Sequence, residues 1–182
     1  MSKRALILID IQNDYFSAGK WPLHEMEAAA ANAARILHAA RREGDRVIHV
    51  RHEFQSEDAP FFTPGSEGAR LHASVQPLES EPVVLKHKVN AFLDTELKSL
   101  LDEAGIEQVT LVGAMSHMCI DAAARASSDL GYATTVVHDA CATRDQEFGG
   151  QVIAAPQVHA AYMASLAFAY AKLLSTEQYL AG

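Results

Sequence analysis

The feature that most limits how this chain can fold is a regular alternation of short apolar segments with longer helical ones. Residues 4–10 form a continuous apolar run that ends in Asp10, which is typical of a strand buried on both faces of a parallel sheet. Further strands are predicted at 46–51, 83–85, 107–113 and 133–138, and helices at 24–43, 94–104, 119–131 and 156–174. The alternation predicts an α/β fold, a doubly wound parallel sheet of about five to six strands with helices on both faces.

Turn and cap residues set the predicted boundaries. Gly44 and Gly105 each follow a helical segment, as C′ glycines do, and Pro156 opens the last helix. Residues 178–180 are predicted to add a short edge strand. The proline-containing stretch 52–81 has little periodicity, and we interpret it as a functional loop because passive connections are usually shorter.

Composition places limits on the class of protein. With 182 residues we expect a single domain over 1–182, and a hydrophobic fraction of 49% is ordinary for a globular protein. The net charge of −8, without a basic cluster, argues against nucleic acid as a partner. No apolar run is long enough for a transmembrane helix or a signal peptide, so we expect no membrane partner and a cytoplasmic location. Two cysteines do not form a disulfide framework in a chain of this length.

Three chemically reactive side chains follow the carboxyl ends of three different predicted strands. They are Asp10, Lys86 and Cys119. In an open parallel sheet, ligands bind beyond the carboxyl ends of the strands, where the strand order reverses. The sequence therefore predicts that these three side chains converge on one site.

Their chemistry fits nucleophilic catalysis. Cys119 is predicted at a helix N-terminus, where backbone N–H groups and the helix dipole lower a thiol pKa and favour the thiolate. Asp10 can accept and return a proton, and Lys86 can stabilise both negative charges. The backbone N–H groups of Met115 and Cys119 are placed to form an oxyanion hole. Each residue also has a structural alternative: a buried apolar cysteine, a capping aspartate and a solvated lysine.

Four segments together resemble the isochorismatase-like cysteine hydrolases. They are Asp10-Ile11-Gln12-Asn13-Asp14-Tyr15, the stretch 86–97, the stretch 113–119 and Asp139-Ala140. The resemblance runs from Asp10 to at least Pro156 and implies the fold predicted above. It also implies an Asp-Lys-Cys catalytic triad, which falls on Asp10, Lys86 and Cys119. The lysine lies six residues before Phe92, and Lys88, which faces the same way in a strand, is the alternative. A cis peptide bond between Ala114 and Met115 is implied as well.

The resemblance implies a hydrolase that cleaves an amide, lactam or carbamoyl C–N bond of a small molecule through a thioester. The alternatives are an isochorismatase-type hydrolase without covalent catalysis and a non-catalytic scaffold of the same fold. The family's usual assembly implies a homo-oligomer, a dimer or larger. Tyr15 and Ser116 depart mildly from the family's common phenylalanine and threonine. The zinc-binding Asp-x-His pair is replaced by Val50-Arg51-His52-Glu53, so we expect no metal and no cofactor.

Four side chains are candidates for lining the substrate pocket: Tyr15, His52, Phe92 and His117. His117 lies beside the cysteine in sequence and has the alternative role of a helix cap. Cys141 and Asp139 are interpreted as structural. The sequence does not identify the substrate.

Overall fold

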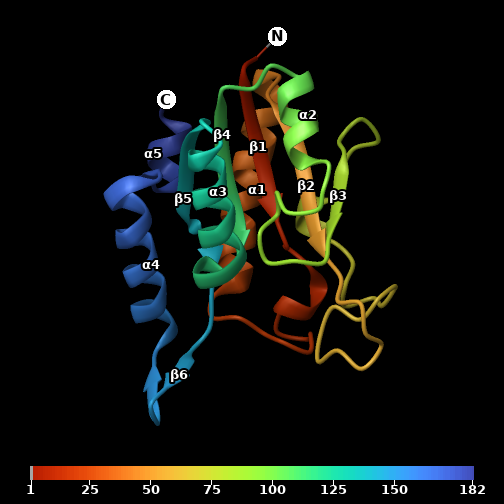
Figure 1. Ribbon diagram of the computed structural model, residues 1–182, viewed down its shortest axis with the longest axis vertical. Coiled ribbons are helices and arrows are strands. Elements are labelled where there is room, and N and C mark those ends of the chain that lie inside the picture. Colours follow the sequence, from red (N-terminus) through yellow and green to blue (C-terminus); the bar gives the residue numbers. More distant parts are fainter. Residues whose placement is uncertain (1) are drawn as a thin grey trace.

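The computed structural model describes residues 2–182 and contains one sheet of six parallel strands (Figure 1). The strands are β1 (Arg4–Ile9), β2 (Arg46–His52), β3 (Val83–Lys86), β4 (Gln108–Ala114), β5 (Ala133–Ala142) and β8 (Lys172–Leu174). Their order across the sheet is β3-β2-β1-β4-β5-β8. All five neighbouring pairs are parallel, as the alternation of strands and helices predicts.

Helices cover both faces of the sheet. The helices are α1 (Met26–Glu43), α2 (Leu97–Glu103), α3 (Asp121–Asp129), α4 (Ala155–Ala169) and α5 (Thr176–Leu180). Leu6 and Leu8 of β1 pack in one hydrophobic cluster with α1, whereas Ile7 and Ile9 pack in a second cluster with α2, α3 and α4. Because successive strand side chains point to opposite faces, this division shows that β1 is buried on both sides. The doubly wound α/β fold is therefore confirmed.

The strand order reverses between β1 and β4. The chain runs from β1 outward to β2 and β3, then returns to the other side of β1 with β4 and continues to β5 and β8. At this point Gly113 pairs with Ile9 and has a φ of 125°. A Cβ at residue 113 would lie 1.9 Å from the Ile9 carbonyl oxygen, so only glycine lets the two strands approach here. The carboxyl ends of β1 and β4 thus flank the ligand-binding edge.

The C-terminal segment differs from its prediction. The last long helix, expected to reach residue 174, ends at Ala169, and Lys172–Leu174 pairs with β5 as strand β8. Residues 178–180, expected to be a strand, belong to α5. The reason is a capping box: the Ser175 hydroxyl accepts from the Gln178 N–H, and the Gln178 side chain accepts from the Ser175 N–H.

Two helices begin at residues other than those predicted, and one hairpin was not predicted. Asp94 does not cap α2; it has a φ of 57°, and the helix begins at Leu97. The segment Ser116–Ile120 is a π-helical turn, and α3 begins only after it. A hairpin of β6 (Gln146–Phe148) and β7 (Gln151–Ile153) projects at the lower end of Figure 1 and was not predicted.

Across residues 2–182, no helix combines the length and apolar character needed to cross a bilayer.

The buried carboxylate of Asp14 anchors the long loop between β2 and β3. Asp14, in the short 3-10 helix Asn13–Tyr15, is 3% exposed and accepts hydrogen bonds from the N–H groups of Phe62 (2.7 Å) and Lys20 (3.2 Å). Gly68 lies against it, and a Cβ there would come within 2.2 Å of the Asp14 carboxylate. The Asp14 side chain therefore contacts the loop at Phe62 and at Gly68 and holds it beside the sheet edge.

Candidate active site

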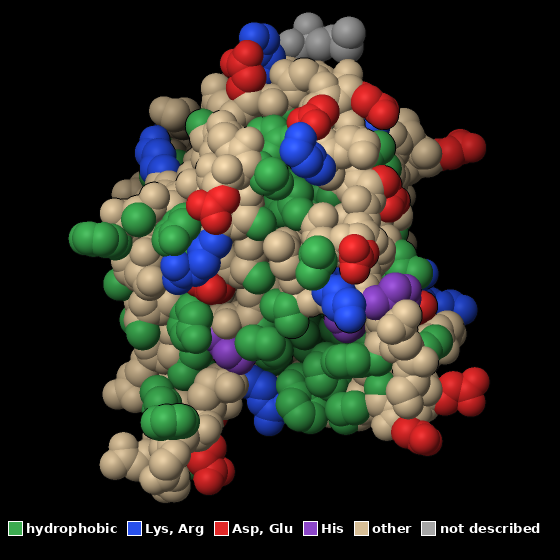
Figure 2. All heavy atoms as spheres, in the orientation of Figure 1, with side chains coloured by type: hydrophobic (Ala, Val, Ile, Leu, Met, Phe, Trp, Pro, Cys, Tyr) green, Lys and Arg blue, Asp and Glu red, His purple; other side chains and the backbone are tan. Residues whose placement is uncertain are grey.

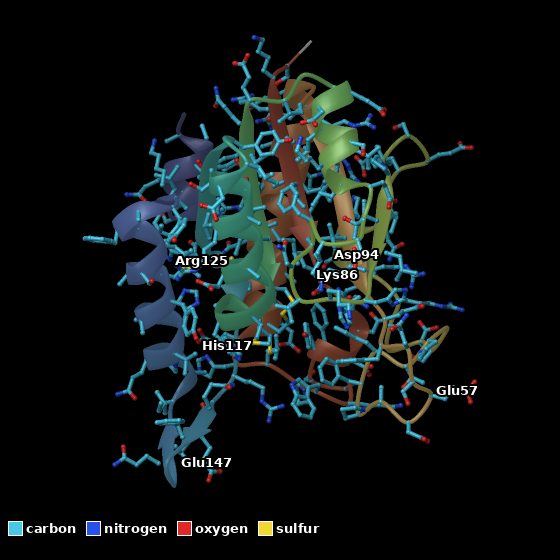
Figure 3. The ribbon with its side chains drawn as sticks, in the orientation of Figure 1. Glu57, Lys86, Asp94, His117, Arg125 and Glu147 are labelled. Atoms are coloured by element: carbon cyan, nitrogen blue, oxygen red, sulfur yellow. The ribbon has the colours of Figure 1, made fainter. Side chains whose placement is uncertain are left out.

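Asp10, Lys86 and Cys119 meet at the carboxyl edge of the sheet. Lys86 Nζ lies 2.8 Å from Asp10 Oδ2 and 3.3 Å from Cys119 Sγ. Asp10 and Lys86 are fully buried, and Cys119 is 6% exposed. The three residues come from the end of β1, the end of β3 and the turn before α3, so the predicted convergence is observed. Figure 3 labels Lys86 just right of the centre of the view and His117 below it and to the left.

The fully buried ammonium group of Lys86 is held by partners on all sides. Besides Asp10 and Cys119, its Nζ lies 2.9 Å from His52 Nδ1 and donates to the backbone carbonyl of Lys88 at 3.2 Å. Burial alone lowers the pKa of Lys86, but the negative charge of Asp10, and that of Cys119 once it ionises, outweigh it, so the pKa is raised and the amine stays charged. The side chain of Lys88, the alternative lysine, is exposed.

His52 is a neutral acceptor in this cluster. Burial and the charge of Lys86 lower the pKa of His52 to about 4. Because Lys86 is a charged donor, the neutral imidazole accepts through Nδ1 and carries its proton on Nε2. The sequence placed His52 as a pocket residue, and the structure gives it a direct contact with the lysine.

The thiol of Cys119 differs from expectation in its protonation. Burial and the charge of Asp10 raise the pKa of Cys119 to about 12, and Lys86 only partly opposes them. The expected lowering of the pKa is therefore wrong, and the resting side chain is a neutral thiol at neutral pH. The reason is that 119 lies inside the π-helical turn Ser116–Ile120 among buried groups, where desolvation exceeds any favourable effect of the helix end.

The backbone around the cluster has two unusual features. Asp10 has a φ of 54°, a left-handed conformation that is uncommon for residues other than glycine, and its N–H donates to the Val50 carbonyl. The peptide bond between Ala114 and Met115 is cis, as the family resemblance implies. Ser116, which follows it, is fully buried and lies 2.7 Å from His159 Nδ1 of α4 through its hydroxyl.

The other candidate pocket residues have different surroundings. Tyr15 is 2% exposed, and its pKa is raised well above the ordinary value, first by burial and then by the charge that Cys119 carries once ionised and by Asp10. His117 is half-buried, and its Nδ1 lies 2.6 Å from the hydroxyl of Thr143. Phe92 stacks on Tyr132, which directly precedes β5 at the opposite edge of the sheet. The structure thus places Tyr15 near Asp10 and Cys119, whereas the aromatic partner of Phe92 is Tyr132, away from the catalytic cluster.

An aromatic wall beside the cluster was missed in the sequence reading. Trp21 stacks on Phe61 with ring centroids 4.7 Å apart, and Phe61 contacts Phe54 edge to face at 5.1 Å. Phe54 in turn contacts His52 at 4.7 Å. Hydrophobic side chains are gathered over the lower part of the face in Figure 2. These rings come from segments without periodicity, so only the spacing of aromatic residues could have indicated them.

The histidines of this region are committed to other contacts. His49 Nε2 lies 3.0 Å from Glu81, and His72 stacks on Phe16 with centroids 3.6 Å apart. Across residues 2–182, no three His, Cys, Asp or Glu side chains converge on a position that could hold a metal ion.

Comparison with known proteins places this geometry in context. The sequence profile of the isochorismatase domain matches residues 4–178. The uncharacterized isochorismatase family protein YddQ of Bacillus subtilis is 46% identical over 176 residues, covering 97% of this chain and 98% of that protein. A maleamate amidohydrolase of Pseudomonas putida is 31% identical, covering 80% of this chain and 75% of its own. A crystal structure of a 54% identical chain from Oleispira antarctica has a TM-score of 0.95, covering 98% of this chain and 96% of that one.

Proposed function

This chain belongs to the isochorismatase family of hydrolases, and from that premise we propose that it cleaves a C–N bond of a small molecule with Cys119 as nucleophile. The bond is an amide, lactam or carbamoyl linkage, and the intermediate is a thioester. The observation that carries the proposal is the contact of one buried lysine with both a carboxylate, at 2.8 Å, and a thiol, at 3.3 Å. A relative named as an amidohydrolase supports the choice of bond.

In the first step the sulfur forms a bond to the carbonyl carbon while its proton passes to Asp10. Because burial raises the pKa of Cys119 to about 12, the thiol does not ionise beforehand, and proton removal has to accompany the attack. Asp10 suits this role because its carboxylate lies beside the thiol, and the side-chain hydrogen bond between Cys119 and Asp10 is one of the causes that raise the pKa of Cys119. The N–H groups of Met115 and Cys119 would hold the negative charge on the carbonyl oxygen, each donor contributing about 3–4 kcal/mol.

In the second step the C–N bond breaks and Asp10 returns the proton to the departing nitrogen. Water then attacks the thioester carbon, Asp10 accepts a proton from the water, and the sulfur leaves with that proton as the neutral thiol. Lys86 stays charged throughout and keeps Asp10 ionised between steps. His52 helps to fix the position of the Lys86 amine, with 2.9 Å between its Nδ1 and the Lys86 Nζ.

The test is intact-protein mass spectrometry after mixing with a library of small amides, lactams and carbamoyl compounds. A hydrolysed substrate should give a transient acyl adduct that maps to Cys119 and is absent in Cys119→Ala. Hydrolysis without an adduct under rapid quenching, with full activity in Cys119→Ala, would indicate the noncovalent isochorismatase-type reaction. No turnover of any compound would favour a scaffold.

We also propose that the chain forms a homo-oligomer through α4. This helix carries no charged residue, yet Phe168 on it is 92% exposed. The neighbouring β6–β7 hairpin exposes Phe148 (82%) and Val152 (69%). A helix that is apolar on its exposed side normally packs against another surface. Light scattering at micromolar concentration should give a mass of two subunits or more, and a mass near 19.7 kDa would refute the proposal.

A further inference from the structure

The turn that carries Cys119 is joined to helix α4 by one buried hydrogen bond. Ser116, the first residue of the π-helical turn Ser116–Ile120, is fully buried, and its hydroxyl lies 2.7 Å from Nδ1 of His159. His159 lies in the first half of α4 and is half-buried. Because a buried hydroxyl without a partner is costly, this contact fixes where the turn begins relative to the helix.

The next residue of the turn is held by a different part of the chain. His117 Nδ1 lies 2.6 Å from the hydroxyl of Thr143, which directly follows β5. Ser116 and His117 are therefore held by two separate elements, α4 and the end of β5. Cys119 lies two residues farther along the same turn, with its sulfur 3.3 Å from Lys86 Nζ. The two contacts thus set the position of the nucleophile, although neither includes it.

His159 makes this contact as a neutral group. Burial, and after it the charge of His138, lower the pKa of His159, and Asp139 opposes them only in part. The ring is therefore uncharged at pH 7, and its contact with Ser116 is a hydrogen bond between two neutral groups. Replacing His159 at this pH consequently tests the hydrogen bond and not the loss of a charge.

The position of the turn sets two distances that the proposed reaction needs. Met115 immediately precedes Ser116, and Cys119 lies inside the turn. The sulfur has to reach the carbonyl carbon of the substrate while the N–H groups of Met115 and Cys119 reach the carbonyl oxygen. A misplacement of about 1 Å in such an arrangement can lower the rate about a hundredfold. A group that holds the start of the turn therefore acts on the reaction without contacting the substrate.

Building on the proposed function, we propose that His159 is a positioning residue, which through the Ser116 hydroxyl holds the π-helical turn where Cys119 and the two N–H groups act on the same carbonyl. The inference rests on that function, because it assigns a role within the same reaction. His159 does not touch the reacting atoms, so its loss should lower kcat and leave KM nearly unchanged.

Two substitutions of His159 separate the hydrogen bond from the bulk of the ring. His159→Phe keeps a planar ring and removes the nitrogen that contacts Ser116, whereas His159→Asn keeps a polar atom close to the position of Nδ1. We expect His159→Phe to lower kcat about tenfold to hundredfold with KM changed less than about threefold, and His159→Asn to recover most of the loss. His138→Asn is the matched control and should leave kcat unchanged. His138 lines the same cavity as His159, with 6.5 Å between the ring centroids, and is not the partner of Ser116.

The other end of the hydrogen bond gives a second set of variants. Ser116→Ala should lower kcat as His159→Phe does, and it carries the same comparison should His159→Phe not fold. Ser116→Thr, which keeps the hydroxyl, should retain activity. The double variant Ser116→Ala, His159→Phe should lose no more than the larger single change, because both remove one bond. Additive losses, or a kcat within about twofold of wild type in folded His159→Phe, would overturn the proposal. A rise in KM with unchanged kcat would also overturn it, because it would place His159 at the substrate.

A second measurement does not depend on hydrolysis. An aldehyde with the acyl group of a hydrolysed amide forms a hemithioacetal: the Cys119 sulfur bonds to its carbonyl carbon, and the thiol proton passes to the carbonyl oxygen. Propionaldehyde is the probe where no amide is hydrolysed. Binding is measured as protection of Cys119 from iodoacetamide at mildly alkaline pH, followed by mass spectrometry, with Cys141 as the internal reference. His159→Phe should weaken the protection about tenfold, and His159→Asn much less, because the same N–H groups hold the oxygen of the adduct.

The outcomes separate this inference from the proposed function. Protection that weakens in His159→Phe, without hydrolysis of any amide by the wild-type protein, would refute the proposed function but support the positioning of Cys119 by His159. Hydrolysis through Cys119, with kcat and protection equal in wild type and His159→Phe, would refute the positioning role alone. A fall in melting temperature with unchanged kcat would overturn that role as well, because it would show that the bond only stabilises the fold.

Discussion

Removing the ammonium group of Lys86 should cost much of the stability of the fold. In Lys86→Met the apolar stem is largely kept, but the fully buried Asp10 loses the one cation that lies within 4.0 Å of it among residues 2–182. Breaking one half of a buried pair costs about 3–5 kcal/mol because the other charge stays buried and unpaired. A domain of this kind has a total stability of about 5–15 kcal/mol. The variant should therefore be folded but markedly weakened.

The assay is urea denaturation at neutral pH, followed by circular dichroism. Because the pKa of Lys86 is raised above its ordinary value of 10.5, its contribution is fully present below about pH 10.5 and is lost only as pH rises through the folded-state pKa. Lys88→Met, at an exposed side chain, should change stability by less than about 0.5 kcal/mol. The double variant Asp10→Asn, Lys86→Met should lose less than the sum of the single changes.

Two results would refute this reasoning. One is a loss below about 1 kcal/mol in Lys86→Met, which would mean that Asp10 is stabilised by something other than the pair. The other concerns activity: kcat/KM should fall far more in Lys86→Ala than in Lys88→Ala, and the reverse order would move the catalytic assignment to Lys88.

Four further outcomes are expected. Cys119→Ser should keep less than about a tenth of the activity while folding normally, because a serine hydroxyl is a harder acid for Asp10 to deprotonate; higher retention would contradict covalent catalysis. Since the pKa of Cys119 is raised to about 12, its alkylation rate should rise continuously from neutral to alkaline pH, and a plateau near pH 8 would show a thiolate. The pKa of His52 is lowered to about 4 from its ordinary 6.5, so between these pH values the unfolded chain binds a proton that the folded chain does not. Stability should therefore fall as the pH is lowered from 6.5 to 4, and it should fall less in His52→Gln. Activity should survive dialysis against a chelator; loss that zinc restores would reveal a metal requirement.

Sequence reasoning located the strands and the three central side chains because both follow from local pattern. Buried strands have continuous apolar runs, and parallel topology brings their carboxyl ends together whatever the intervening chain does. The prediction of secondary structure was wrong where pairing with a distant segment of the chain decides which element forms. Strand β8 has three residues, too few for any period, and forms because it pairs with β5. The capping box at Ser175 was present in the sequence and would have identified α5.

Protonation of the cysteine could not be predicted from local sequence. Its position after a strand and before a helix indicated a lowered pKa, but burial raises the pKa, and burial depends on segments far away in the chain. The end of β5 is a simpler case: the strand was predicted to end at 138 and in fact ends at Ala142.

The anchoring of the long loop by Asp14 suggests how this protein could be re-engineered. The contacts to Phe62 and Gly68 fix the part of the loop nearest the aromatic wall. The segment 55–60 is mostly exposed, and Glu57 within it points away from the molecule (Figure 3). A library that randomises 55–60 while keeping Asp14 and Gly68 should therefore yield mostly folded variants. The same library without that constraint should lose expression and activity together, because the aromatic wall would no longer be held in place.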